Sequence, residues 1–270
     1  MGLPELPERG SQPDKPSCAR MYDYWLGGAH DFAIDREAAE RVLAAMPSMR
    51  SIIQANRAFL RRAVRFVAEQ GVDQFLDLGS GLPTVGSVHE TAQAINPAAR
   101  VVYVDIDPVV VAYAGTLLKR NPLVTALQGD LREPERLLRA SAVQRLLDFN
   151  RPVGLLFVSV LHFVLDDNEA EQLVQRFADA LSSGSYLVVT HASYDYAPPE
   201  VGAQVERSSV ATGTPLHVRG PAAIRRYFEG FELVDPGLVY LPLWRPEDPE
   251  DLFLDRPEQS SGYAGVGRKP

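Results

Sequence analysis

Between residues 74 and 190 the chain alternates short apolar runs with segments whose apolar residues recur at helical spacing. The runs predict buried strands over Gln74–Leu78, Arg100–Val104, Val124–Gln128, Val153–Val158 and Tyr186–Thr190. The intervening segments predict helices over Val85–Ile95, Pro108–Leu118, Glu133–Phe149 and Asn168–Leu181. Near-continuous apolar strands that alternate with helices predict an α/β fold with a mostly parallel sheet covered on both faces.

Helical segments flank this core on both sides. One is expected over Asp35–Met46, and a longer one runs from the capping residue Ser48 to Gly71, whose type is common just past a helix end. After Thr190 the segment up to about residue 215 is loop-like or weakly helical. A short helix and two strands then follow, at Pro221–Phe228, Gly237–Trp244 and Tyr263–Gly267.

No clean linker or internal repeat divides the chain. The first 17 residues contain four prolines and mixed charge, which predicts a disordered tail. We therefore expect a tail over residues 1–18 and one domain over residues 19–270. Within that domain, residues 19–71 form an N-terminal helical extension and residues 72–270 form the core.

Composition excludes several classes of partner. The net charge is −8 with no basic run, which argues against a nucleic-acid partner. No apolar run approaches the ~18 residues of a membrane span. Cys18 is the one cysteine, and the first residues lack the apolar stretch of a signal peptide. We expect a cytoplasmic protein with no membrane contact, and the oligomeric state is unknown from sequence.

The first predicted strand ends in a glycine loop, DLGSGLPT, which contains Asp77, Gly79, Ser80 and Gly81. Glycines at this point allow a ligand to approach the backbone, although an ordinary tight turn has the same pattern. A dinucleotide loop would place a third glycine where Thr84 stands, and the Asp77 carboxylate would repel a pyrophosphate. The loop suits a ligand with an ammonium and no phosphate, such as S-adenosyl-L-methionine.

Further carboxylates end the next two strands. Asp105 lies 24 residues after Gly81 (105 − 81 = 24), where a carboxylate can accept both ribose hydroxyls. The neighbouring Ile106 can lie against an adenine face, and Asp130 can accept from the adenine amino group. Each acid alone could be a helix N-cap, as we expect for Asp107 before Pro108. Three strands that all end in aspartate favour an adenosyl ligand.

Four motifs together resemble a known family. DLGSGLPT, VHETAQ, RVVYVDIDPVV and MYDYWLGG look like those of bacterial S-adenosylmethionine-dependent methyltransferases formerly filed as a domain of unknown function. The resemblance spans about Arg20 to Arg268. It implies a Rossmann-like class I fold with a seven-stranded, mostly parallel sheet, a C-terminal antiparallel hairpin and an N-terminal helical lid. It also implies that Asp77, Gly79 and Gly81 hold the methionine end, Asp105 the ribose, and Asp130 with Leu131 the adenine.

Two upstream segments supply further candidates for cofactor binding. Aromatic residues surround Gly27-Gly28, and they form either an arm that docks into the core or a lid over the cofactor. Tyr22 is the first candidate there, since aromatic faces attract a sulfonium. Arg57 is either an ordinary surface arginine or the cation for the methionine carboxylate. Carboxyl methyltransferases with a similar loop use an upstream arginine in this way.

Residues after the fourth and fifth strands are candidates for the chemistry. Ser159 is expected in the cofactor site, and His162 and His191 are expected to be the catalytic residues, as general bases. Either histidine could instead be structural, and His89 is expected to be structural. We expect no metal site, because the histidines are scattered and the cysteine stands alone.

The sequence thus predicts a methyltransferase that acts on an oxygen or nitrogen of a small-molecule substrate. Two alternatives remain open at this point. One is a non-catalytic regulatory module that binds S-adenosylmethionine, because the motifs concern the cofactor and not turnover. The other is a NAD-dependent oxidoreductase, against which Asp77 and the missing third glycine argue.

Overall fold

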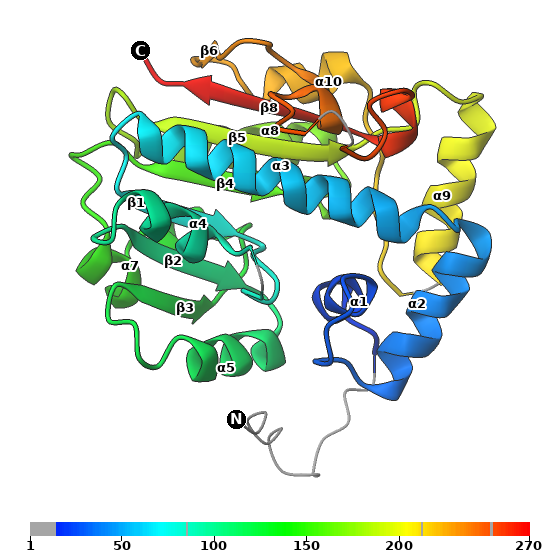
Figure 1. The fold of residues 1–270 in the computed structure, drawn as a ribbon, viewed down its shortest axis with the longest axis horizontal. Helices are drawn as coiled ribbons and strands as arrows, with labels where there is room; N and C mark the ends of the chain where they lie inside the picture. The colour runs from blue at the N-terminus through cyan, green and yellow to red at the C-terminus, as the bar shows by residue number, and fades with distance from the viewer. Residues whose placement is uncertain (1–14, 85, 212, 249–250) are drawn as a thin grey trace.

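The described residues form one eight-stranded sheet with helices on both faces, as seen in a computed structural model (Figure 1). The structure describes residues 15–84, 86–211, 213–248 and 251–270. The strands are β1 (Gln74–Leu78), β2 (Arg100–Asp105), β3 (Val124–Gln128), β4 (Gly154–Val158), β5 (Tyr186–Ala192), β6 (Glu232–Leu233), β7 (Val239–Tyr240) and β8 (Gly262–Arg268). The α-helices are α1 (Cys18–Trp25), α2 (Ala33–Ala45), α3 (Met49–Glu69), α4 (Val88–Ile95), α5 (Pro108–Leu117), α6 (Pro134–Leu138), α7 (Ser141–Leu146), α8 (Asp167–Ala178), α9 (Pro199–Ala211) and α10 (Pro221–Arg226). Short 3₁₀ turns are η1 (Leu161–Phe163), η2 (Leu241–Leu243) and η3 (Pro257–Ser260).

The strand order reverses beside β1. The order is β3-β2-β1-β4-β5-β8-β6, with β7 also paired to β8. Strands β1 to β5 are parallel, and β8 runs antiparallel to β5, β6 and β7. The chain moves outward through β2 and β3 and then returns to place β4 against the other edge of β1. Loops diverge at such a reversal and leave a crevice at the carboxyl ends of the strands. The predicted fold class is confirmed.

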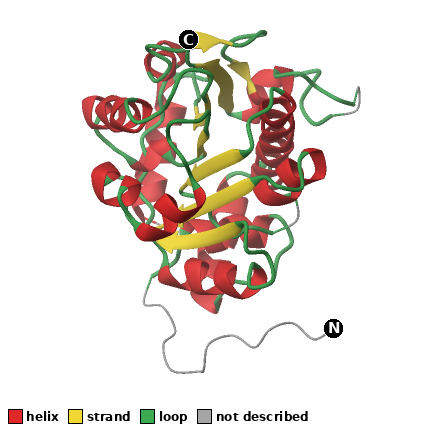
Figure 2. Cartoon of the chain, turned by 90° about the vertical axis from the view of Figure 1, so that its left-hand side faces the viewer, coloured by secondary structure: helices red, strands yellow, loops and turns green. Residues whose placement is uncertain are grey.

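Alternate side chains of each strand enter two separate cores. Phe75 and Tyr103 pack with apolar residues of α3 and α4. Leu76 and Phe157, on the opposite face, pack with residues of α7, α8 and α10. Figure 2 shows helices on both sides of the strands. This burial of both faces explains why the strands are apolar at nearly every position.

Helices α1 and α2 of the N-terminal extension lie beyond the carboxyl ends of the strands, whereas α3 lies over one face of the sheet (Figure 1). Arg20 on α1 pairs with Asp35 on α2 through its Nε, at 2.7 Å from Oδ2, and with Asp107 at the start of α5. The His30 ring lies 3.9 Å, centroid to centroid, from the ring of Tyr113 on α5. These contacts fasten α1 to the core, so that the extension closes one side of the crevice.

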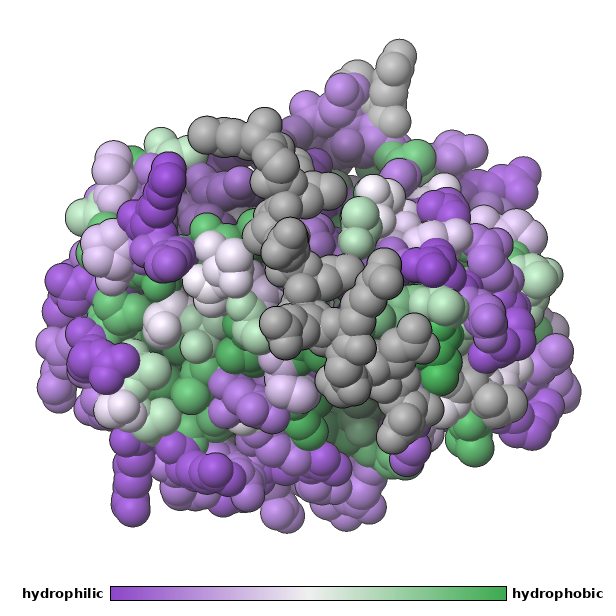
Figure 3. Space-filling model, turned by 90° about the horizontal axis from the view of Figure 1, so that it is seen from below, coloured by the Kyte–Doolittle hydropathy of each residue, from purple (hydrophilic) through white to green (hydrophobic). Residues whose placement is uncertain are grey.

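The lower surface of the molecule, as oriented in Figure 1, carries both hydrophilic and hydrophobic residues. Viewed from below, hydrophilic residues dominate the margins and hydrophobic residues gather nearer the centre (Figure 3). None of the helices in the described ranges is both long and apolar enough to cross a membrane.

The C-terminal strands differ from expectation. Of the predicted strand Gly237–Trp244, only Val239–Tyr240 pairs with β8, and the chain then turns into η2. Pro242 lacks the N–H that a ladder requires, which explains the early end. The short strand β6 was not predicted. It pairs with β8 through Glu232 and Leu233.

Several helices also differ in their bounds. The predicted helix Glu133–Phe149 is two helices, α6 and α7, separated by an extended residue at Ala140. The helix predicted from Val85 begins at Val88, and Val85 itself lies outside the described residues. Ser48 is the N-cap of α3 but makes no side-chain capping bond. Asp107 caps α5 as expected, accepting from Val109 N at 2.9 Å.

The predicted tail falls largely outside the described residues, which begin at Lys15. Its last residue, Cys18, is the first residue of α1. Ser17 N donates to Asp35 Oδ1 at 2.9 Å, so the ordered extension includes this residue.

We expect Arg20→Ala to lower the free energy of unfolding by about 3–5 kcal/mol, the cost of leaving a buried charge without its partner. Asp35 has an exposed fraction of 0%, so water cannot replace the guanidinium. Urea unfolding measures the loss, and limited proteolysis should show faster cleavage between residues 15 and 32.

Arg136→Ala is the control. Arg136 is 80% exposed and pairs with Glu133 at the surface, so its loss should change the free energy of unfolding by less than about 1 kcal/mol. Equal losses in both variants would contradict a fastening role for Arg20.

Candidate active site

A cavity of about 1200 Å³ opens where the parallel strands end. Its wall comes from the strand ends, α1, the first half of α3, and α9 with the residues that follow it. All of the predicted cofactor residues line it: Tyr22, Arg57, Asp77, Gly79, Ser80, Gly81, Asp105, Ile106, Asp130, Leu131 and Ser159. His162 and His191 also line it. The structure therefore brings every predicted site residue to one place, while His89 lies on α4, where its ring contacts Tyr103.

The glycine loop requires its two glycines for conformation and for space. Gly79 and Gly81 have φ values of +69° and +59°, in the left-handed region that favours glycine. A Cβ at Gly79 would stand 2.2 Å from Cγ2 of Val160. The amides of Gly79 and Ser80 both donate to Val104 O, at 2.8 and 3.1 Å, which ties the loop to β2.

Asp77 and Arg57 are an oppositely charged pair that the described residues leave without hydrogen bonds. Alternation along β1 places Asp77 on the same face as Phe75, beneath α3, which carries Arg57. Asp77 is 5% exposed and Arg57 is 8% exposed, and Nε of Arg57 has no partner. Burial raises the pKa of Asp77 to about 7, although the charge of Arg57 opposes that shift.

The Asp105 carboxylate organises the loops after β1 and β2. Its Oδ2 accepts from Gly81 N at 2.8 Å, and its Oδ1 accepts from Asp107 N at 2.9 Å. Burial raises its pKa. The side chain of Ile106 is 58% exposed beside it. Asp105 can accept further hydrogen bonds, because each carboxylate oxygen has two lone pairs and accepts one hydrogen bond from the backbone.

Asp130 is held by a residue that the sequence reasoning did not single out. Arg132 donates to both carboxylate oxygens, with Nη2 at 2.7 Å from Oδ2. These bonds lower the pKa of Asp130 and keep it ionised. The spacing of two residues is the one signal in the sequence that could have shown this pair.

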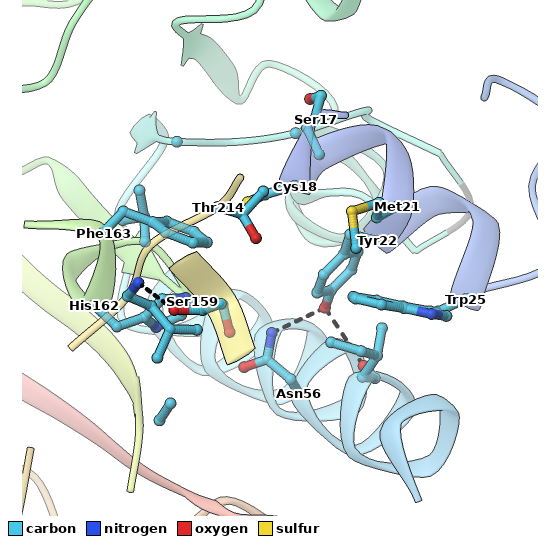
Figure 4. A pocket seen from close by; sticks show the side chains of 18 of the residues that line it. Ser17, Cys18, Met21, Tyr22, Trp25, Asn56, Ser159, His162, Phe163 and Thr214 are labelled. Atoms are coloured by element: carbon cyan, nitrogen blue, oxygen red, sulfur yellow. Dashed lines mark hydrogen bonds between the residues drawn. The ribbon is translucent and has the colours of Figure 1, made fainter. Parts of the chain in front are cut away.

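A chain of hydrogen bonds connects the N-terminal extension with the ends of β4 and β5, and Figure 4 shows its first bond, between Asn56 and Tyr22. Asn56 Nδ2 donates to the hydroxyl of Tyr22 at 2.9 Å, and Thr190 Oγ1 donates to Asn56 Oδ1 at 2.8 Å. Ser159 N in turn donates to Thr190 Oγ1 at 2.9 Å. Ser159 has a φ of +55°, a strained conformation for a residue with a Cβ that is typical of functional sites.

The aromatic face of Tyr22, which was predicted to contact the sulfonium, makes a cation–π contact with Arg57. The Arg57 guanidinium carbon lies 5.5 Å from the centroid of the Tyr22 ring. The ring therefore positions Arg57 at this side of the cavity, a contact that sequence reasoning did not anticipate.

The two histidines differ in what their nitrogens contact. The ring Nδ1 of His191 lies 2.8 Å from Ala192 O, and its Nε2 lies 3.0 Å from Nη1 of Arg219. His162 Nδ1 is buried and has no hydrogen-bond partner among the described residues. Burial lowers the pKa of His162 to about 4, with a further lowering by Arg219, so its ring is neutral at physiological pH. The His191 ring nitrogens therefore both have partners, whereas the His162 ring remains able to accept a hydrogen bond.

Arg219 supports the turn that carries His162. It is 4% exposed, and it donates to Leu161 O at 3.2 Å, to Val164 O at 2.8 Å and to Asp167 Oδ1 at 2.7 Å. It comes from an irregular segment more than fifty residues along the chain, with no periodic or motif signal. The sequence could not have placed it here.

Sequence and structure comparisons agree on the family. A sequence model described as S-adenosyl methyltransferase matches residues 6–270. The chain belongs to the S-adenosyl methyltransferase family. Among curated proteins, none matches it.

Two solved structures resemble the methyltransferase along most of both chains. A putative methyltransferase from Thermobifida fusca YX is 42% identical, with 94% of this chain and 95% of that chain covered and a TM-score of 0.88. A DUF574 family protein from Streptomyces avermitilis MA-4680 is 38% identical, with 95% and 98% covered and a TM-score of 0.89.

The site of this methyltransferase fits S-adenosyl-L-methionine, the cofactor of its family. The Arg57 guanidinium, whose Nε has no partner, and the Asp77 carboxylate, which makes no hydrogen bond among the described residues, both line the cavity and complement a carboxylate and an ammonium. The loop residues 77–84 contain no lysine of the kind that binds phosphate, which agrees with a ligand that has none.

We expect Asp77 to contribute a loss of stability as the pH rises from about 4 to about 7, while the buried His162 and His191, whose pKa values are lowered, contribute in the opposite direction. The Asp77 carboxyl has an ordinary pKa of 3.8 and a folded-state pKa of about 7. Within this interval the folded state keeps a proton that the unfolded state has lost, so each rise in pH favours unfolding. Asp77→Asn removes the penalty and should raise the free energy of unfolding at pH 8 by an amount on the order of 1–4 kcal/mol.

Urea unfolding at pH 4, 6 and 8 checks the difference between variant and wild type. Asp179→Asn, at an exposed carboxylate after α8, is the control and should leave the pH dependence unchanged. A difference for Asp77→Asn that is the same at all three pH values would contradict the raised pKa.

Proposed function

We propose that this methyltransferase methylates an oxygen or nitrogen atom of a small-molecule acceptor in the cytoplasm. One observation carries the proposal: the side chains of Asp77, Arg57 and His162 line one cavity, and none of the three makes a hydrogen bond among the described residues. The first pair suits the zwitterionic end of an amino acid, and the histidine suits a hydroxyl or amine hydrogen. The net charge of −8 argues against a nucleic-acid acceptor.

Each part of the cofactor is bound by residues of complementary chemistry. Arg57 and Asp77 take the methionine carboxylate and ammonium, and the loop from Gly79 to Gly81 allows their close approach. Asp105 accepts from the ribose hydroxyls, Ile106 and Leu131 lie against the adenine, and Asp130 accepts from its amino group. When bound, S-adenosylmethionine supplies a methyl group made electrophilic by the sulfonium.

The chain itself contributes alignment, exclusion of water and a proton acceptor. Helix α1 covers part of the cavity and Tyr22 joins it to Asn56, which limits the access of bulk water to the site. Ser159 and Thr190 fix the end of β4 from which His162 follows. The hydroxyl or amine of the substrate donates a hydrogen bond to the neutral His162 ring. This bond orients the lone pair of the substrate atom that receives the methyl group. His191, which contacts Ala192 O and Arg219, supports the Arg219 side chain.

We expect the wild type to bind S-adenosylhomocysteine and Arg57→Ala to bind it at least about 30-fold more weakly, because removing one partner of a buried charge pair costs about 2 kcal/mol or more. Isothermal titration calorimetry measures both affinities. Arg65→Ala, two turns along the same helix in an exposed pair with Glu247, should bind as the wild type does.

The same calorimetry separates the alternatives. NAD should give no heat of binding, and tight NAD binding would favour an oxidoreductase. An Arg57→Ala variant that is folded and binds with unchanged affinity would contradict the assignment of Arg57.

We expect His162→Ala to lower turnover by about 10²-fold or more, the usual contribution of a positioned proton acceptor. Release of S-adenosylhomocysteine over a panel of phenols and amines measures turnover. Since the pKa of His162 is about 4, its ionisation should add no limb to the wild-type pH profile between pH 6 and 8.

Calorimetry with S-adenosylhomocysteine is the control and should show unchanged affinity in His162→Ala. Wild-type turnover in this variant would contradict the role of His162. Binding of S-adenosylhomocysteine without wild-type turnover on any acceptor would favour a sensing module.

A further inference from the structure

The cavity extends beyond the residues assigned to the cofactor. Its volume of about 1200 Å³ exceeds the ~300–1,000 Å³ usual for the site of one drug-sized ligand. The additional wall comes from α1, the residue after α2, the start of α3, η1, the segment after β5, and α9. It includes Trp25, Met46, Met49, Phe163, Tyr194 and Val205. We call these six residues the acceptor wall.

The acceptor wall is continuous between segments far apart in the chain. The hydroxyl of Tyr194 lies 3.5 Å from Sδ of Met46, which joins the segment after β5 to the end of α2. Trp25 packs in one cluster with Met49. Figure 4 shows Phe163 and His162 on the opposite side of the cavity from Tyr22 and Trp25. An occupant would therefore lie between aromatic rings on two sides.

Charges on the cavity wall are already paired or exposed. Outside the cofactor set, the charged residues that line the cavity among the described residues are Lys15, Arg20, Asp23, Arg41, Asp107 and Arg132. Arg20 pairs with Asp107, Asp23 with His30, and Arg132 with Asp130.

Lys15 and Arg41 are exposed. A charged occupant beside the acceptor wall would thus lose water without gaining a buried partner, because Lys15 and Arg41 are themselves hydrated, and this is unfavourable.

The acceptor wall has the chemistry that binds flat rings. Thioethers such as Met46 and Met49 make favourable contacts with aromatic rings, and Trp, Tyr and Phe stack with them or meet them edge to face. The imidazole of His162 lines this part of the cavity and makes no side-chain hydrogen bond among the described residues. A hydroxyl on the ring would donate to it.

We propose that the acceptor is an uncharged aromatic molecule with a hydroxyl group, held on the acceptor wall with that hydroxyl toward His162. This inference rests on the proposed function, because it assigns the remaining half of the cavity to the methyl acceptor. It excludes sugars, amino acids and polyamines as the acceptor class.

Three probes with the same ring system test the charge preference. They are 2-naphthol, naphthalene-2-sulfonate and 1-naphthylmethylammonium, titrated into the wild-type protein by calorimetry with saturating S-adenosylhomocysteine and again without it. The neutral probe should bind at least about 10-fold more tightly than either charged probe, a difference of about 1.4 kcal/mol. Charged probes that bind as tightly as 2-naphthol would overturn the proposal.

A matched pair of valines on α9 tests the location. Val205 lines the cavity, whereas Val210 is 65% exposed and does not line it. Val205→Asp should weaken binding of 2-naphthol by at least about 10-fold, because it puts an unpaired carboxylate on the acceptor wall. Val210→Asp should bind the probe as the wild type does. Equal effects of the two substitutions would overturn the proposal.

A second variant covers the case in which Val205→Asp does not fold. Val205→Trp keeps an apolar side chain but fills the space, and it should also weaken probe binding while the affinity for S-adenosylhomocysteine stays unchanged. If S-adenosylhomocysteine binds and 2-naphthol does not, the acceptor class is wrong and the methyltransferase site stands. If S-adenosylhomocysteine itself fails to bind, the proposed function fails, and the titrations without it still decide whether the acceptor wall prefers an uncharged aromatic ligand.

Discussion

The pairing of β1 with β2 on one side and β4 on the other is the constraint on which the site depends. Because these strands are parallel, their carboxyl ends meet at one edge, and the reversal of order beside β1 leaves the crevice there. Asp77, Asp105 and Ser159 reach that crevice from successive strand ends. Pleat alternation then decides which of them lie beneath α3. A one-residue change of register would send Asp77 into the opposite core.

The cost of this arrangement is a buried carboxyl without a hydrogen-bond partner among the described residues. Burial raises the pKa of both Asp77 and Asp105, but Asp105 accepts hydrogen bonds from two backbone amides. Contacts elsewhere in the structure must offset the unfavourable burial of Asp77. The buried ion pair between Arg20 on α1 and Asp35 on α2 is one of the contacts that hold the elements around the crevice together. Binding groups at active sites are commonly stabilised by the structure around them in this way.

Local signals made the cofactor side of the site predictable. Gly79, Gly81 and Asp105 each belong to a strand end, and their spacing along the chain determines where they lie once the sheet forms. Residues that act through distant contacts had no such signal. Thr190 meets Asn56 across 134 positions, and Arg219 reaches the turn of His162 from an irregular segment. The predicted strand Gly237–Trp244 was wrong for most of its length, because apolar composition outweighed the proline within it.

The cofactor residues and the acceptor wall lie on different kinds of element, so the two parts of the cavity differ in how freely their residues can be substituted. Cofactor residues lie at strand ends whose positions the whole sheet fixes. Much of the acceptor wall lies on α1, α2 and α9, which stand beyond the sheet edge and contribute little to its two cores. Substitutions such as those at Val205 can therefore accumulate without disturbing the sheet. Related chains can thus diverge in what they methylate while they retain one way of holding the methyl donor.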